Sequence, residues 1–166
     1  MKIIKLLTFF IAVLFSTSAL AQQVLPSVNV KTLDGKTTNI TDICDDSDFT
    51  VISFWATWCS PCKRELDAIA DLYPDWQENY NVKVVAVSID NSRNLPKVRP
   101  MVETKGWDYL ILSDANEELK RVMNVQSIPH TFLVDKGCNI VWTHVGYSPG
   151  DEYELEDVIK EKSGKK

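Results

Sequence analysis

A pair of cysteines, Cys59 and Cys62, stands where a buried strand is expected to give way to a helix. The stretch 49–56 is short, apolar and rich in aromatic and β-branched residues, which predicts a buried strand. The stretch 60–80 has helical spacing, and Pro61 suits the first turn of a helix, where its missing N–H costs nothing. The two cysteines therefore lie at the start of a helix, one turn apart on the same face.

This placement predicts a redox centre. The free N–H groups and the positive dipole end of a helix start favour a thiolate, so Cys59 is expected to be the nucleophile. Cys62 is expected to resolve a mixed disulfide that forms on Cys59. A CxxC pair can also be half of a zinc site, but that site needs a second pair at ligand spacing. The other cysteines, Cys44 and Cys138, stand alone in the sequence.

The N-terminal residues 1–21 have the pattern of a signal peptide: a basic start, an apolar core over 6–15 and small residues up to Ala21. The apolar core is shorter than the roughly 20 residues of a membrane span. The residue directly after Ala21 is not a cysteine, which argues against lipid attachment there. We therefore expect a periplasmic or otherwise exported protein, soluble after cleavage near Ala21, with one domain over 22–166.

The charge balance argues against nucleic acid as a partner. The formal net charge is -5, and it becomes -7 when Lys2 and Lys5 are removed, because 16 basic residues then face 23 acidic ones. Export would place the cysteines in an oxidising compartment, where a disulfide persists.

The sequence contains two histidines, His130 and His144, and neither has a spacing that indicates a metal site. We expect no cofactor.

The order of the remaining segments predicts an α/β protein. Asp34-Gly35 between 28–32 and 37–40 indicates a hairpin. The strand 82–89, nearly all apolar and β-branched, should be covered on both faces and should complete a right-handed βαβ unit. The reactive turn would then lie at the carboxyl edge of the sheet. Pro74 is expected to kink or split the long helix. Further along, we expect a helix over 95–105, a strand over 109–112, a helix over 116–123, a hairpin of 131–134 with 140–145, and a last helix over 149–161.

Three sequence runs resemble the thioredoxin superfamily and, within it, the TlpA/ResA-like group of exported thiol:disulfide oxidoreductases: 33–36, 54–65 and 128–135. The resemblance implies a thioredoxin fold, with a central mixed β-sheet flanked by helices and an extra N-terminal β-hairpin. It also implies a cis bond before Pro129, opposite Cys59, where the backbone of Ile128 meets a substrate strand. The residues alone would favour a trans proline at the start of an edge strand.

The resemblance is incomplete at one acidic position. Many thioredoxins bury an aspartate six residues before the first active-site cysteine, whereas this chain has Ser53 there. The TlpA/ResA-like group carries a glutamate three residues after the second cysteine, and Glu65 occupies that position. The resemblance implies that Glu65 takes or returns the proton of Cys62. The alternative is an exposed helical glutamate that pairs with a neighbouring basic residue.

Two further residues are expected at the site, and two at the opposite end of the sheet. Trp58, beside Cys59, is expected to shield the reactive sulfur or to contact substrate. His130, next to the proline, is within expected reach of the sulfurs or a substrate, and its charge would matter near neutral pH. Cys44 and Cys138 are expected to approach at the far end of the sheet. A structural disulfide is favoured there over two free thiols.

The expected function is reduction or isomerisation of protein disulfides, with the direction set by a reduction potential that the sequence leaves open. The resemblance implies a membrane electron donor and duties in cytochrome c maturation or general disulfide reduction. We expect a monomer. A copper chaperone-like CxxC module is the alternative, although the expected cis proline would occupy the position that a metal needs. A peroxidase would consume hydrogen peroxide rapidly, but the threonine-then-cysteine pattern of peroxiredoxins is absent.

Overall fold

The structure is a computed structural model that describes residues 23–164, so the expected signal peptide over 1–21 lies outside the described residues. The strands form one seven-stranded sheet in the order β2-β1-β5-β4-β3-β6-β7. The strands are β1 (Asn29–Thr32), β2 (Thr37–Asn39), β3 (Phe49–Trp55), β4 (Val82–Ser88), β5 (Leu110–Ser113), β6 (His130–Asp135) and β7 (Ile140–Val145). The helices are η1 (Ile40–Cys44), α1 (Ser60–Tyr80), η2 (Leu95–Lys97), α2 (Val98–Lys105), α3 (Glu118–Val122) and α4 (Asp151–Ser163).

The sheet is mixed. Strands β3, β4 and β5 run parallel at its centre, and α1 is the crossover between β3 and β4. The antiparallel pair β6 and β7 extends one side, and the β1–β2 hairpin extends the other through β5. This arrangement confirms the expected thioredoxin fold with an extra N-terminal hairpin.

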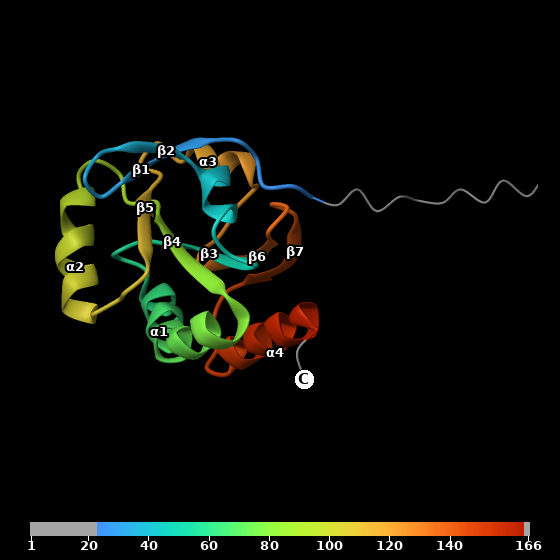
Figure 1. The fold of residues 1–166 in the computed structure, drawn as a ribbon. Helices are drawn as coiled ribbons and strands as arrows, with labels where there is room; N and C mark the ends of the chain where they lie inside the picture. The colour runs from blue at the N-terminus through green and yellow to red at the C-terminus, as the bar shows by residue number, and fades with distance from the viewer. Residues whose placement is uncertain (1–22, 165–166) are drawn as a thin grey trace, which may run out of the picture.

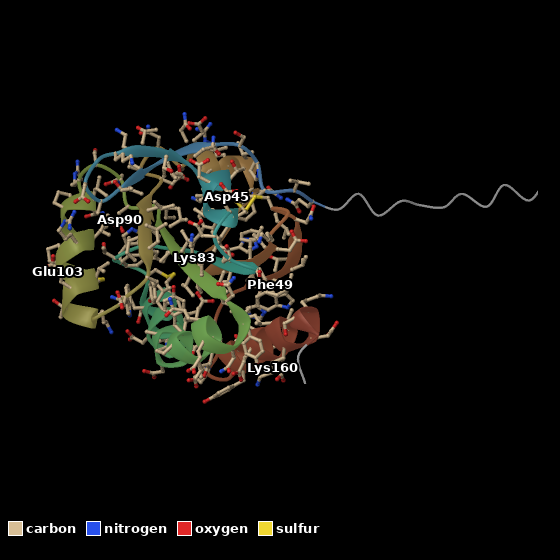
Figure 2. All side chains as sticks on the ribbon, in the orientation of Figure 1. Asp45, Phe49, Lys83, Asp90, Glu103 and Lys160 are labelled. Atoms are coloured by element: carbon tan, nitrogen blue, oxygen red, sulfur yellow. A yellow bond between two sulfur atoms is a disulfide. The ribbon has the colours of Figure 1, made fainter. Side chains whose placement is uncertain are left out.

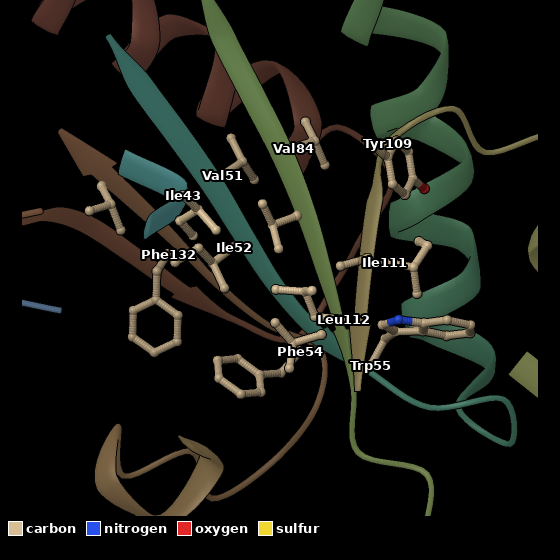
Figure 3. Packing of buried hydrophobic residues seen from close by; sticks show 14 of the residues in the cluster. Ile43, Val51, Ile52, Phe54, Trp55, Val84, Tyr109, Ile111, Leu112 and Phe132 are labelled. Atoms are coloured by element: carbon tan, nitrogen blue, oxygen red, sulfur yellow. The ribbon is translucent and has the colours of Figure 1, made fainter. Parts of the chain in front are cut away.

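Helices cover both faces of the sheet, with α1 and α4 on one face and α3 on the other (Figure 1). Along β3, alternate side chains point to opposite faces. Ser53 faces α1, since it bonds to Glu65 there, and Thr50 faces η1, since it bonds to the carbonyl of Ile43. All seven residues of β3 are buried, as expected for a central strand. Figure 3 shows Phe54 and Trp55 packed in this core, and burying each ring contributes about 2–3 kcal/mol.

Pro74 was expected to kink or split the long helix, and it does not split it, because α1 runs unbroken from Ser60 to Tyr80. Pro74 removes one backbone hydrogen bond, but buried side chains lie on both sides of it, among them Ile69 and Trp76. Packing of both halves against the core keeps the helix continuous, because tertiary contacts outweigh a local defect of this size.

The other helices differ in detail from the expected ranges. The segment expected as one helix over 95–105 consists of η2 followed by α2. Helix α3 is short, and the carboxylate of Asp114 accepts hydrogen bonds from the backbone N–H groups of Glu118, Leu119 and Lys120 at its start.

No helix within residues 23–164 combines the length and apolar character that crossing a membrane requires.

A disulfide joins Cys44 at the end of η1 to Cys138 in the turn between β6 and β7, with the Cα atoms 5.8 Å apart. Asp135 pairs with Phe49, the first residue of β3, so this turn lies at the end of the sheet opposite Cys59. Figure 2 labels Asp45, the residue that follows Cys44 in the chain. The first described residues are held here too, because the backbone N–H of Leu25 donates to the carbonyl of Cys138 at 2.8 Å.

Candidate active site

The reactive pair lies at the start of α1. Cys59 is the N-cap residue, with extended backbone angles, and Pro61 occupies the first turn. The backbone N–H of Cys62 donates to Sγ of Cys59 at 3.3 Å. The two cysteines form a disulfide with their Cα atoms 5.4 Å apart, and Cys62 is fully buried while Cys59 is 5 % exposed. In the reduced state, the same N–H group and the helix dipole would stabilise a thiolate on Cys59.

The Ile128–Pro129 peptide bond is cis and lies against the reactive pair. Sγ of Cys59 is 3.9 Å from the carbonyl oxygen of Ile128. The carbonyl of Pro129 accepts a hydrogen bond from the backbone N–H of Gly146 at 2.8 Å, which ties this loop to the end of β7. Trp58, next to Cys59 in the chain, is 62 % exposed and offers an apolar surface beside the disulfide.

Glu65 is buried, with 5 % of the residue exposed, so the alternative of an exposed ion-paired glutamate is wrong. Ser53 Oγ donates to one carboxylate oxygen and Thr131 Oγ1 donates to the other, both at 2.7 Å. Ser53 and Thr131 face each other across β3 and β6. The hydroxyl at position 53 therefore orients a carboxylate that comes from α1, where many thioredoxins place the carboxylate on the strand itself.

The environment of Glu65 suits proton exchange near neutral pH. Burial raises the pKa of Glu65 from its ordinary 4.5 to about 7, against the opposing effect of the hydrogen bonds from Ser53 and Thr131. Glu65 lies three residues after Cys62 on α1, on the same face of the helix. A carboxyl group with a pKa close to the working pH is the kind that transfers protons efficiently.

The side chain of His130 is held away from Glu65. Its Nε2 atom is 2.9 Å from Oγ1 of Thr143, and its ring stacks on Phe132 with the ring centres 4.2 Å apart. Because His130 and Thr131 are neighbours on β6, their side chains point to opposite faces of the sheet. Burial lowers the pKa of His130, which keeps the imidazole neutral near pH 7. Its Nδ1 atom is buried and has no partner among the described residues.

One residue of this region was missed by sequence reasoning: Asp90, which is completely buried just after β4 (Figure 2). Its carboxylate accepts hydrogen bonds from the backbone N–H of Thr57 at 2.8 Å, from Oγ1 of Thr57 at 2.7 Å and from Oγ of Ser88 at 2.9 Å. Nζ of Lys63 donates to the carbonyl of Thr57 at 3.2 Å. The loop that leads into Cys59 is thus held from two directions. The available signal was an aspartate directly after a buried parallel strand.

Comparison with known proteins places this geometry in a family. The model of the AhpC/TSA family matches residues 21–143, which is most of the chain. The chain belongs to the AhpC/TSA family. This family member is 30 % identical over 152 residues to the sporulation thiol-disulfide oxidoreductase A of Bacillus subtilis (strain 168), covering 86 % of this chain and 90 % of that protein.

Two further similarities agree with this result. The thiol-disulfide oxidoreductase ResA of Bacillus thuringiensis (strain Al Hakam) is 27 % identical over 129 residues, covering 78 % of this chain and 72 % of that protein. The solution structure of an uncharacterized thioredoxin-like protein from Porphyromonas gingivalis is 43 % identical, with a TM-score of 0.76, covering 84 % of this chain and 92 % of that one. The fold is thioredoxin-like, and the reaction class of this AhpC/TSA family member is thiol-disulfide oxidoreduction.

Replacing Asp90 by asparagine is expected to lower the free energy of unfolding of this AhpC/TSA family member by about 1–3 kcal/mol. An amide replaces one carboxylate oxygen by an NH2 group, so one of the hydrogen bonds that Thr57 donates to the carboxylate is lost. Urea-induced unfolding of the two oxidised proteins measures the difference. Thr57→Ser is the matched control, since it keeps both donors and should cost only about the 0.8 kcal/mol of one buried methyl group. Equal stability of Asp90→Asn and the unmodified protein would contradict the anchoring role.

Proposed function

We propose that this AhpC/TSA family member is an exported protein-disulfide reductant or isomerase, in which Cys59 is the nucleophile and Cys62 the resolving thiol. The observation that carries the proposal is the position of Sγ of Cys59, which receives the N–H of Cys62 at the start of α1 and lies beside the carbonyl of Ile128. A sulfur held in this way is both activated and placed next to backbone groups that can bind an extended substrate.

In the first step, the thiolate of Cys59 attacks one sulfur of a substrate disulfide. A new S–S bond forms between Cys59 and the substrate, and the old S–S bond breaks. The second substrate sulfur leaves as a thiolate and takes a proton. The exposed ring of Trp58, together with Ile128, Pro129 and His130, would form the surface on which the substrate lies at this stage.

In the second step, the thiol of Cys62 passes its proton to the carboxylate of Glu65 and attacks Sγ of Cys59. The bond between Cys59 and the substrate breaks, and the departing substrate thiolate receives the proton from Glu65. The substrate has then gained two electrons and two protons, and the protein carries the Cys59–Cys62 disulfide seen in the structure. We propose a membrane electron donor that returns two electrons, which makes the cycle complete.

Two observations support export. The Cys44–Cys138 bond is remote from the reactive pair, and disulfides with no catalytic part are typical of proteins in oxidising compartments. The second observation is the signal-like pattern of residues 1–21, which we propose are removed to leave one domain over 22–166.

Within residues 23–164, no three histidine, cysteine, aspartate or glutamate side chains gather in a way that would hold a metal ion. We propose that the protein acts as a monomer, with cytochrome c maturation or general disulfide reduction as its duty.

Replacing Cys62 by serine is expected to trap substrate proteins covalently on Cys59, because the mixed disulfide then has no resolving thiol. The Cys62→Ser protein should be isolated from its native compartment, and the partners should be released by dithiothreitol and identified by mass spectrometry. The Cys59→Ser/Cys62→Ser double variant should trap none. If Cys62→Ser captures nothing while the unmodified protein still reduces disulfides, the proposed substrate class is wrong. Stoichiometric copper or zinc in the purified reduced protein would instead favour a metal-binding module.

A further inference from the structure

A groove of about 560 Å³ lies beside the reactive pair, between α1 and the segment formed by η2 and α2. Lys63, which lines it, follows Cys62 directly and reaches the carbonyl of Thr57 with its ammonium group. The groove therefore opens next to the loop that carries Cys59. Its lining residues are Lys63, Pro96, Lys97, Pro100, Met101, Thr104 and Lys105.

The groove is positively charged in a protein that is acidic as a whole. Among the described residues, its lining includes three lysines and no carboxylate. Only Lys105 is neutralised, by an ion pair with Asp67 at 2.6 Å. Nζ of Lys63 donates to a carbonyl and Nζ of Lys97 donates to the side-chain oxygen of Asn94 at 3.0 Å, so neither lysine has an acidic partner among the described residues. The chain as a whole carries a formal charge of -5.

A second groove, of about 660 Å³, shows that this charge is not a general property of the surface hollows. Its lining combines the basic Lys31 and Arg99 with the acidic Asp114 and Glu118, and Arg99 pairs with Asp34. The groove beside the reactive pair is different, because two lysines that form no ion pair among the described residues meet an apolar wall there. That wall consists of Pro96, Pro100 and Met101.

We propose that the groove beside the reactive pair binds an acidic segment next to the disulfide of a protein substrate. The inference rests on the proposed function. Carboxylates of the segment would meet Lys63 and Lys97, and its apolar side chains would lie against Pro100 and Met101. Charges at the rim of an interface act mainly on the rate of encounter and on the choice of partner. The groove would therefore select among exposed disulfides by the charge of the residues beside them.

The test compares three disulfide-bonded peptides that are identical except for flanking residues, which are aspartate, asparagine or lysine. For the unmodified protein, kcat/KM should be highest for the acidic peptide and lowest for the basic one. The spread should shrink as salt rises from about 0.05 M to about 0.5 M, because ions screen exposed charges. Lys97→Glu should lower the ratio of kcat/KM for the acidic peptide to that for the neutral one by about tenfold.

The matched control is Lys136→Glu, which makes the same charge change in the exposed β6–β7 turn at the other end of the sheet. It should leave all three values unchanged. Equal kcat/KM for the three peptides would overturn the groove proposal and leave the proposed function standing. If the unmodified protein reduces none of the peptides, the proposed function itself is contradicted. A Lys97→Glu effect that accompanies loss of a dimer in sedimentation experiments would also overturn the proposal, since a second copy would then occupy the groove.

Discussion

In the unmodified protein, ionisation of Glu65 is expected to lower the free energy of unfolding by about 3 kcal/mol between pH 4.5 and pH 7. Replacing Glu65 by glutamine should abolish this pH dependence. Burial raises the pKa of Glu65 to about 7, so the unfolded chain releases this proton at a lower pH than the folded protein does. The contribution of Glu65 to stability is therefore complete below pH 4.5 and is lost as the pH rises through 7. A neutral amide has no such dependence.

The measurement is the difference in free energy of unfolding between the two proteins, from urea titrations at pH 5, 6, 7 and 8. Taking the difference cancels the titration of other groups, such as His130. Relative to the unmodified protein, Glu65→Gln should gain stability between pH 5 and pH 7 and level off by pH 8, where Glu65 is ionised in both the folded and the unfolded state. Asp71→Asn, on the exposed side of the same helix, is the matched control and should show a nearly constant difference. A constant difference for Glu65→Gln as well would mean that Glu65 is charged in the folded protein throughout this range.

The same variant separates the proposed catalytic role from a structural one. If Glu65 accepts the proton of Cys62, Glu65→Gln should slow the release of substrate from the mixed disulfide about a hundredfold near pH 7. Formation of the mixed disulfide by Cys59 should change much less. Single-turnover experiments with quenching and gel separation distinguish the two steps. Should release keep its rate and its pH profile in Glu65→Gln, the carboxylate would have a packing role only.

The second large effect concerns the remote disulfide. Replacing Cys44 and Cys138 together by serine should lower the free energy of unfolding by about 4–5 kcal/mol, because the bond closes a loop with a sequence separation of 94. Denaturant unfolding measures this loss. Turnover of a peptide disulfide below the unfolding temperature should stay close to that of the unmodified protein, since the bond lies at the opposite end of the sheet from Cys59. A loss of less than about 1 kcal/mol would contradict a stabilising role for this bond.

Local patterns were sufficient for the elements that position the reactive pair. The strand that ends at Trp55 and the strand 82–88 are continuous apolar runs, and the helix after Cys59 has an unmistakable start. Local reasoning could not decide between a kink and a split at Pro74, because the sequence around it carries no information about the core contacts that hold both halves of α1. The cis bond before Pro129 came from the family resemblance alone, since the adjacent residues favour the trans form.

The rest of the site depends on contacts between distant segments. Ser53 stands where many thioredoxins have an aspartate, but its hydroxyl and that of Thr131 both donate to the carboxylate of Glu65. These contacts require both the register of β3 with β6 and the packing of α1. Asp90 is separated from Thr57 by 33 residues, so its role emerges only when parallel strands bring their ends together. The charge of the groove beside the reactive pair likewise depends on which lysines find carboxylates in space.

The backbone bonds that fasten the first described residues to the β6–β7 turn also set a direction. Ile140 donates to the carbonyl of Gln23, and Leu25 donates to Cys138, so the chain enters the fold at the end farthest from Cys59. If a lipid-embedded anchor or an affinity tag is joined ahead of Gln23, Cys59 and Cys62 therefore lie at the end of the domain opposite the point of attachment. Immobilising the protein through its N-terminus should consequently preserve access for bulky partners.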